Sequence, residues 1–417
     1  MTPEIEKRIK AVRVGRQLNV RQEMKKIEDI FEETCEKNHP DAEVLTIIQG
    51  VGTVPREQSG REIIYDKNSL ASYKYVKKGD FIIHLRSFEG GLEVANSDGI
   101  VSPAYIILHP KIEVSTIYLY ALFHTNRFIN QTMAPAVEGA RDGRSVKYDV
   151  LKKQKILFPP LSEQKKIAEI LATQDRVIEL KEKLIAEKQS QKKYLMSVLL
   201  GDDFKKPFKL NGVIIDKKKW RDVSLSDCCL SEGQYGLNAP ACAFKDNLPK
   251  YIRITDIDED GRYNRSSVAY VDVDDYENYL LNENDVLLVR TGSTTGKSYL
   301  YDKNDGKLVY AGFLIRFNIN PEFVDKRVVY ACLNTNSYWK WVGVMSMRSG
   351  QPGINATEYS KYRFKIPLDK KEQKAIADVL SAVDEEISLL QKGLEQEKLK
   401  KKSLMQLLLT GLVRVKV

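Results

Sequence analysis

Two short segments resemble catalytic signatures, and each lacks a part that its chemistry requires. The segment GSTTGKS (292–298) is similar to a phosphate-binding loop, but only three residues separate Gly292 from Gly296 where that motif needs four. The segment NPEF (320–323) is similar to the Asn-Pro-Pro-Phe/Tyr motif of amino-methyltransferases, but Glu322 replaces the second proline. The sequence therefore favours neither nucleotide hydrolysis nor methyl transfer by this chain itself.

Residues that could hold a metal ion lack the spacing that metal binding needs. Pro40-Asp41 with a Glu-x-Lys triplet at 163–165 or 372–374 could suggest a nuclease, but the triplets lie over 100 residues away on predicted helices. The histidines are scattered without ligand spacing: His39, His84, His109 and His124. We therefore expect a chain that is not an enzyme and that has no metal ion or cofactor of its own.

Composition points to a soluble cytoplasmic protein with an anionic partner. The 417 residues include 66 Lys and Arg and have a net charge of +9, which favours a polyanion because each phosphate contact releases condensed counterions. The five cysteines form no CxxC pair, so a disulfide framework is not expected. No apolar run is long enough to span a membrane, and the N-terminus is not typical of a signal peptide.

Cations and polar side chains that could contact DNA recur in the predicted loops of both halves. Arginine can bond guanine at two atoms and glutamine can do so with adenine, whereas lysine, serine and threonine more often hold phosphates. A solvated surface charge is the simpler interpretation of any single residue, so the hypothesis rests on the group. The candidates are Arg56, Lys74, Arg86, Arg141, Arg144, Lys147 and Tyr148 in the first half, and Arg253, Arg290, Thr291, Ser293, Lys297, Arg348 and Gln351 in the second.

The chain repeats itself at an offset of 209 residues. EQKKIAEIL (163–171) matches EQKAIADVL (372–380), and both copies read as long helices. No Pro or Gly interrupts 161–200, and Ser162 and Asp369 are plausible N-caps because their side-chain oxygens can accept from backbone N–H groups of the first turn.

Each predicted helix has an apolar stripe that needs a partner. The second copy steps by four and three residues, which is a heptad seam, while the first has a wider stripe. We expect the two helices to pack on each other as an antiparallel pair, because each leaves its own globular half and a pseudo-two-fold axis then relates the halves. The interface residues expected are Ile167, Leu171, Ile178, Leu184, Ile376, Leu380, Val383, Ile387, Leu390 and Leu394.

The segments between the helices also correspond. KGDFIIHLR (78–86) matches ENDVLLVR (283–290), and YALFHTN (120–126) matches YACLNTN (330–336). The predicted fold class is therefore α+β: two pseudo-repeated mixed α/β domains separated by two long helices that form an antiparallel coiled coil.

These segments resemble the specificity subunits of type I restriction-modification systems, which have two variable target-recognition domains, each followed by a conserved helical region. FPPLSEQKKIAEILATQD (158–175) and KIPLDKKEQKAIADVLSAVD (365–384) resemble the openings of the two helical regions. KKWRDVSLSDCCLSEG (218–233) and LLVRTGSTTGK (287–297) are similar to parts of a second recognition domain, and GIVSPAYIIL (99–108) to part of a first.

The resemblance implies recognition domains at 1–159 and 202–366 and helical spacers at 160–201 and 367–417. Each domain would bind one half of a split, asymmetric sequence in double-stranded DNA, and the helices would fix the gap. Two methyltransferase subunits would supply S-adenosylmethionine and adenine methylation, and restriction/translocase subunits would use ATP and Mg²⁺. An alternative is a coiled-coil scaffold with two protein-binding domains, which would lack the steep salt dependence of phosphate contacts.

Overall fold

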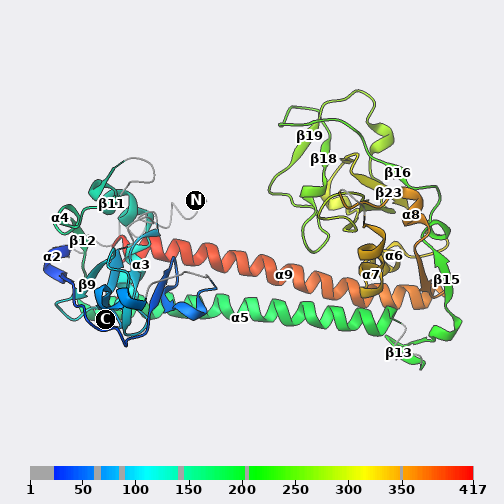
Figure 1. Cartoon of the computed structure of the whole chain (residues 1–417). Helices are drawn as coiled ribbons and strands as arrows, with labels where there is room; N and C mark the ends of the chain where they lie inside the picture. Colours follow the sequence, from blue (N-terminus) through cyan, green and yellow to red (C-terminus); the bar gives the residue numbers. More distant parts are fainter. Residues whose placement is uncertain are drawn as a thin grey trace. The chain divides into compact units, whose positions relative to one another are not determined.

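The chain forms two compact units, each of which combines a mixed α/β domain with parts of two long helices (Figure 1). Unit 1 runs to Leu180 and includes Leu394 onward, and unit 2 is Lys181–Gly393. The computed structural model describes residues 23–60, 67–83, 90–139, 145–201, 206–347 and 351–416. In this described part no helix is long and apolar enough to cross a membrane.

Unit 1 is built on a four-stranded antiparallel sheet with helix α3 (Thr116–Phe123) packed in the same hydrophobic core. Its strand order is β2 (Phe31–Thr34), β9 (Ile106–Pro110), β6 (Phe81–Ile83), β7 (Glu93–Val94). The remaining strands of the described part of this unit form four antiparallel pairs: β1 (Met24–Lys26) with β12 (Lys155–Leu157), β3 (Leu45–Ile48) with β4 (Gly52–Pro55), β5 (Lys74–Val76) with β8 (Gly99–Val101), and β10 (Val137–Glu138) with β11 (Ser145–Val146). Two one-turn helices are α2 (Ile27–Ile30) and α4 (Tyr148–Leu151).

Unit 2 contains the same kind of sheet and a second one. The first has the order β16 (Gln234–Tyr235), β23 (Leu314–Asn318), β20 (Asp285–Val289), β21 (Ser298–Leu300). The second has the order β17 (Ala241–Cys242), β19 (Ala269–Val271), β18 (Lys250–Ile252), β22 (Leu308–Tyr310). The described residues of this unit also form two strand pairs and three helices: β13 (Phe208–Leu210) with β14 (Val213–Ile215), β15 (Arg221–Ser224) with β24 (Arg363–Ile366), α6 (Lys326–Cys332), α7 (Asn336–Met345) and α8 (Ala356–Ser360).

The two domains repeat one arrangement, as the matched segments predicted. Strands β6 and β20 hold the same third place in their sheets, and each follows a turn closed by a buried acid. The carboxylate of Asp80 accepts the backbone N–H of Lys77 at 2.8 Å, and that of Asp285 accepts the N–H of Asn282 at 2.7 Å. The same side-chain role at equivalent positions confirms the pseudo-repeat and the α+β class.

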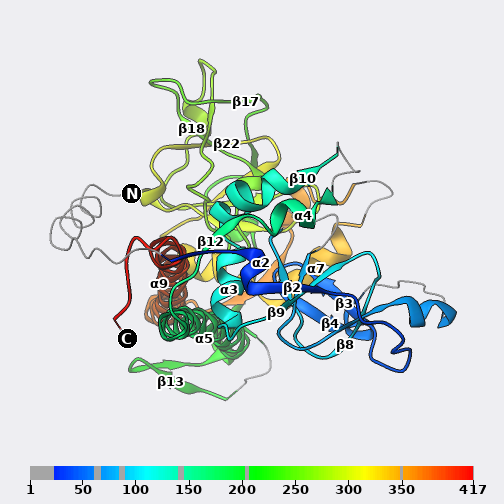
Figure 2. The same cartoon turned by 90° about the vertical axis from the view of Figure 1, so that its left-hand side faces the viewer.

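Helices α5 (Leu161–Leu200) and α9 (Lys370–Leu409) run antiparallel within each unit, where half of one lies beside half of the other (Figures 1 and 2). In unit 1 the amide of Gln174 donates to the Glu397 carboxylate at 2.8 Å. In unit 2 Lys188 pairs with Glu386 at 2.7 Å, and Lys192, one turn further along α5, pairs with an earlier α9 residue. The antiparallel pairing is therefore confirmed.

One of the two predicted N-caps is wrong. Helix α5 already begins at Leu161, because the carbonyl of Pro160 accepts the N–H of Gln164 at 3.0 Å, and Ser162 lies inside the first turn. Asp369 does precede α9, and its carboxylate accepts the N–H of Lys371 at 2.7 Å. In the first copy, therefore, Pro160 occupies the N-cap position, and its backbone carbonyl accepts the first helical hydrogen bond.

Candidate nucleic-acid interface

In unit 1 a fully buried glutamine joins the domain to the first turn of α5. The Gln164 side chain has no exposed surface. Its carbonyl oxygen accepts the backbone N–H of Ser115 at 3.0 Å, and its amide donates to the carbonyl of Pro159 at 2.9 Å. Ser115 is the N-cap of α3, so this one side chain links the domain's helix to the start of the long helix.

Unit 2 has the equivalent joint at the residue 209 positions later. Gln373 is also fully buried, and its carbonyl oxygen accepts the N–H of Asp325, the N-cap of α6, at 2.9 Å. Its amide donates to the carbonyls of Pro367 at 2.8 Å and Phe323 at 3.2 Å. The repeated glutamine therefore has one role in both halves, which fixes each domain on its own helix.

The glutamate before each glutamine binds the segment that follows the other long helix. Glu163 is buried, accepts from the guanidinium Nε of Arg414 at 2.7 Å, and accepts the N–H of Val415 at 3.3 Å. Glu372 is buried and accepts from the indole N–H of Trp220 at 2.9 Å. The Glu-Gln pair thus forms a joint in each unit, and its repetition in the sequence was the signal that could have revealed it.

The apolar residues predicted to hold the helices together mostly lie inward. Ile178, Val383 and Leu390 are half-buried, whereas Leu184 is exposed. Ile185 is buried in its place, because it lies seven residues after Ile178 and so continues the apolar stripe. Leu184 lies only six residues after Ile178, which turns its side chain away from the stripe. The buried members are Ile167, Leu171, Ile376, Leu380, Ile387 and Leu394.

A rigid turn follows β20 in unit 2 and contains several of the predicted DNA contacts. The hydroxyl of Tyr359 donates to the carbonyl of Val289 at 2.7 Å, and that of Tyr338 to the carbonyl of Gly296 at 2.7 Å. Gly296 has a φ of +94°, and a Cβ there would lie 2.6 Å from a Val342 methyl group. Only glycine fits this position, so α7 holds the turn closely in place.

The turn brings Arg290, Thr291 and Gln351 together. The Arg290 guanidinium lies 4.7 Å from the ring centroid of Tyr235, and Thr291 forms a bridge with Gly353. Gln351 is exposed beside Gly292, and Ser293 is also exposed. The arrangement presents an arginine and a glutamine on a fixed backbone, which are groups suited to bidentate contacts with guanine and adenine. Arg348 lies outside the described residues.

Two other predicted contacts in unit 2 already have intramolecular partners. Arg253 makes a bidentate pair with the buried Asp256, with distances of 2.9 Å from Nε and 2.8 Å from Nη2. Lys297 pairs with Glu259 at 2.7 Å. Either cation would have to leave a carboxylate to reach DNA, so their first role is to support the loops around the turn.

The predicted contacts of unit 1 lie in two separate places. Lys74 donates to the carbonyl of Tyr105 at 2.6 Å, and the Arg56 charge opposes the rise in the pKa of the Tyr105 hydroxyl that burial causes. Lys147 pairs with Glu138 at 2.8 Å, next to the half-buried Tyr148. Arg86, Arg141 and Arg144 lie outside the described residues.

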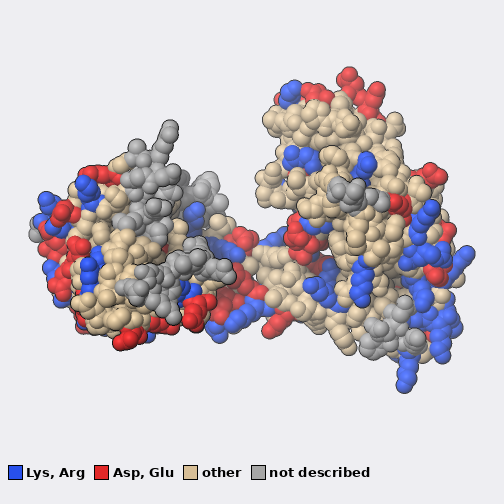
Figure 3. Space-filling model, viewed as in Figure 1, with Lys and Arg blue, Asp and Glu red and all other residues tan. Residues whose placement is uncertain are grey.

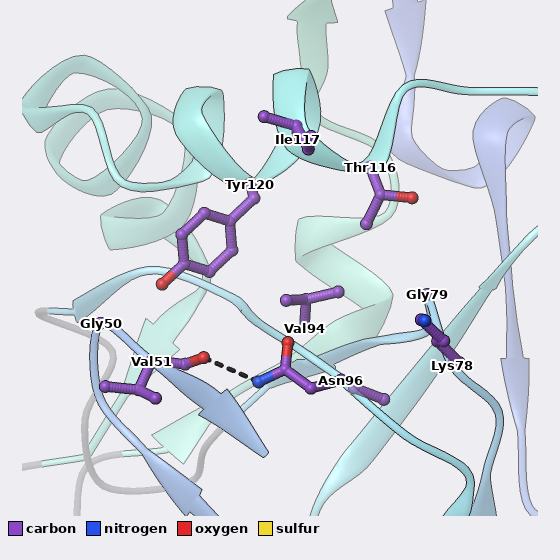
Figure 4. Close-up of a pocket in the computed structure, with 10 residues that line it drawn as sticks. Gly50, Val51, Lys78, Gly79, Val94, Asn96, Thr116, Ile117 and Tyr120 are labelled. Atoms are coloured by element: carbon purple, nitrogen blue, oxygen red, sulfur yellow. Dashed lines mark hydrogen bonds between the residues drawn. The ribbon is translucent and has the colours of Figure 1, made fainter. Parts of the chain in front are cut away.

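Sequence reasoning missed a surface hollow of unit 1 between the β3–β4 turn, the end of β7 and α3 (Figure 4). The Asn96 amide spans its floor and donates to the carbonyls of Val51 at 2.9 Å and Thr53 at 3.0 Å. None of the predicted DNA contacts that the structure describes lines it. Its lining consists of Gly50, Val51, Lys78, Gly79, Val94, Ala95, Asn96, Thr116, Ile117 and Tyr120.

Two of the cysteines of unit 2 lie in surroundings that suppress their ionisation. Burial raises the pKa of the Cys229 and Cys332 thiols to about 12, so neither is a thiolate at neutral pH. In the described part of the chain no three His, Cys, Asp or Glu side chains are grouped to hold a metal ion.

Comparison with known families decides the identity of the two domains. Residues 19–188 and 217–399 each match the family described as the type I restriction modification DNA specificity domain. The chain belongs to this family. The two matches cover most of the sequence and give the family's domain twice, in agreement with the repeated sheet.

Known members of the same kind are similar over most of their length. The MjaVIII specificity subunit of a type I restriction enzyme from Methanocaldococcus jannaschii is 27% identical over 355 residues, 82% of this chain and 80% of that protein. The putative MjaX specificity subunit from the same organism is 28% identical, over 84% of this chain and 82% of that protein.

Two solved structures share the fold. The S subunit of a type I restriction-modification system from M. genitalium aligns with a TM-score of 0.54 at 12% identity, covering 94% of this chain and 97% of that one. A chain from a study of complex assembly and conformational transition of the type I system aligns with a TM-score of 0.58 at 16% identity, covering 95% and 98%. At these identities the likeness supports the architecture alone.

Proposed function

We propose that this chain is the non-catalytic specificity subunit of a type I restriction-modification enzyme, and that each unit reads one half of a split, asymmetric DNA sequence. The observation that carries the proposal is the double match to the specificity domain, which coincides with two copies of one sheet. Each copy is fixed to its own long helix by a buried glutamine. Two recognition domains that are attached to their helices in the same way suit a target with two half-sites.

The two helices would set the length of the unread gap. Each helix has 40 residues, which corresponds to about 60 Å at 1.5 Å per residue. Tethering both domains in one chain raises the effective concentration of the second contact once the first has formed. A domain that is locked to its helix cannot easily accommodate a gap of another length, so the same joints that hold the domains support spacing selectivity.

Other subunits would supply the chemistry. Two methyltransferase subunits would bring S-adenosylmethionine and modify adenine, and restriction/translocase subunits would bring ATP and Mg²⁺ for cleavage. Apolar side chains exposed on the long helices are suited to contact such partners: Leu180, Leu184 and Tyr194 on α5, and Leu389 and Leu399 on α9. Such a complex would work in the cytoplasm, where DNA and both cofactors are present.

Arg290→Ala is expected to relax recognition in the second half-site only. Loss of one bidentate base contact costs about 1–3 kcal/mol of discrimination, so methylation of sites altered at one base pair should rise roughly 10- to 100-fold relative to the intact target. The readout is methylation by the complex on a library with single base changes. Lys307→Ala, which removes an exposed cation elsewhere in unit 2, is the matched control.

Relaxation in the first half-site, or a uniform loss across all sites, would show that the turn after β20 does not read bases. An unchanged base preference with Arg290→Ala combined with Gln351→Ala would exclude the turn altogether.

A further inference from the structure

A large part of the chain's net positive charge lies on one edge of unit 2 and not on its reading turn. Segments 206–227 and 361–365 hold nine Lys and Arg against three Asp, a net charge of +6 out of +9 for the whole chain. Segment 272–284 of the same unit has five exposed acidic residues and no Lys or Arg. The loops around the second sheet would therefore repel DNA, and unit 2 needs cations elsewhere to hold a duplex.

These cations share one surface, which we call the basic edge. Strand β15 pairs with β24, so that Asp222 lies opposite Lys365 and Ser224 opposite Arg363. Figure 3 shows the Lys and Arg side chains gathered over β13 and β15, away from the acidic top of the unit. The exposed members of the basic edge are Lys206, Lys209, Lys218, Lys219, Arg221, Lys361, Arg363 and Lys365.

The backbone under the basic edge is anchored. Lys217 donates to the carbonyl of Val198 at 2.7 Å and also to that of Gly201, and so satisfies carbonyls at the C-terminal end of α5. The neighbouring Trp220 is held by Glu372. Lys218 and Lys219 are thereby presented outward on a segment that is tied to both long helices.

The basic edge also connects with the reading turn. Strand β24 follows α8, whose Tyr359 hydroxyl binds the carbonyl of Val289 at the base of that turn. From there β24 leads to the first turn of α9. The chain therefore leads within a few residues from Tyr359, which holds the reading turn, to the cations of β24, Arg363 and Lys365.

We propose that the basic edge binds the phosphate backbone of DNA flanking the bases that unit 2 reads. Six of its eight exposed cations are lysines, which hold phosphates as point charges without reading sequence. The inference rests on the proposed function, because it takes duplex DNA as the partner. The edge would supply affinity and register, while the turn after β20 supplies the choice of bases.

The test is a variant with Lys209→Gln, Lys218→Gln and Lys219→Gln in the full-length chain. We expect the slope of log K against log salt to flatten by about 2 to 3, and binding at low salt to weaken roughly tenfold on a duplex with flanks of about 20 base pairs. A duplex that ends at the target should lose much less affinity. Base preference should not change, because the reading turn is intact.

The matched control carries Lys245→Gln, Lys303→Gln and Lys307→Gln, which remove the same charge from exposed positions elsewhere in unit 2. Its salt slope should stay close to that of the parent chain. An unchanged slope in the basic-edge variant would overturn the proposal and leave an acidic protein as the partner for this surface. Failure of the parent chain to prefer any sequence would instead count against the proposed function, since the salt slope is measurable on any duplex.

Discussion

Replacing Gln373 with leucine is expected to destabilise unit 2 by about 2–3 kcal/mol while leaving unit 1 intact. The change leaves the part-buried N–H of Asp325 and the carbonyl of Pro367, whose hydrogen bond is buried, without their partner, and an unsatisfied buried polar group costs about 1–3 kcal/mol. Gln164→Leu should do the same to unit 1 through Ser115 and Pro159. Urea unfolding combined with hydrogen exchange of segments 110–120 and 320–330 would measure each effect.

Gln191→Leu is the control, because Gln191 lies exposed on α5 and a surface change of this kind is usually worth less than about 0.5 kcal/mol. Faster exchange confined to the unit that contains the substituted joint is the expected pattern. Equal effects of all three variants would show that the buried glutamines are not the joints between domains and helices.

Inserting four residues into both long helices is expected to lengthen the unread gap by about two base pairs. Four residues add about 6 Å along a helix, which is close to two base-pair steps of 3.4 Å. The insertions belong between Leu180 and Lys181 and between Gly393 and Leu394, where the two units divide. Both helices must be extended, because each half of α5 is paired with half of α9.

Methylation mapping of this variant should therefore give the same two half-sites with a longer gap, and the original target should lose most of its methylation. The same four residues inserted after Asp246, in an exposed turn of unit 2, should leave the gap unchanged. A variant that folds and keeps the original gap would contradict the idea that the helices act as a ruler.

The fold could be predicted because its signals are periodic or repeated. A repeat at an offset of 209 residues showed two equivalent halves, and an apolar stripe on each long helix required a partner. Details that depend on one contact were less accessible. Ser162 has the right residue type for an N-cap, yet the N-cap position belongs to Pro160, two residues earlier, whose carbonyl accepts the first helical hydrogen bond. Leu184 is apolar, yet Ile185 has the spacing that continues the stripe.

The candidate interface was less predictable, because a cation's availability depends on what lies near it in space. The pairing of Arg253 with Asp256 could have been noticed, since the two are three residues apart. The partner of Lys297 is 38 residues away in the sequence, and no local pattern marks it. The basic edge joins segments more than 130 residues apart, which strand pairing alone brings together.

A map of modified adenines would show whether this chain directs methylation to a split target. The chain is expressed with its methyltransferase partner in a host that lacks adenine methylation, and the genome is read by single-molecule sequencing. One split, asymmetric motif with a constant gap is expected, and it should be lost when the chain is left out. A stable complex that methylates a continuous sequence, or sites without a common motif, would contradict this expectation.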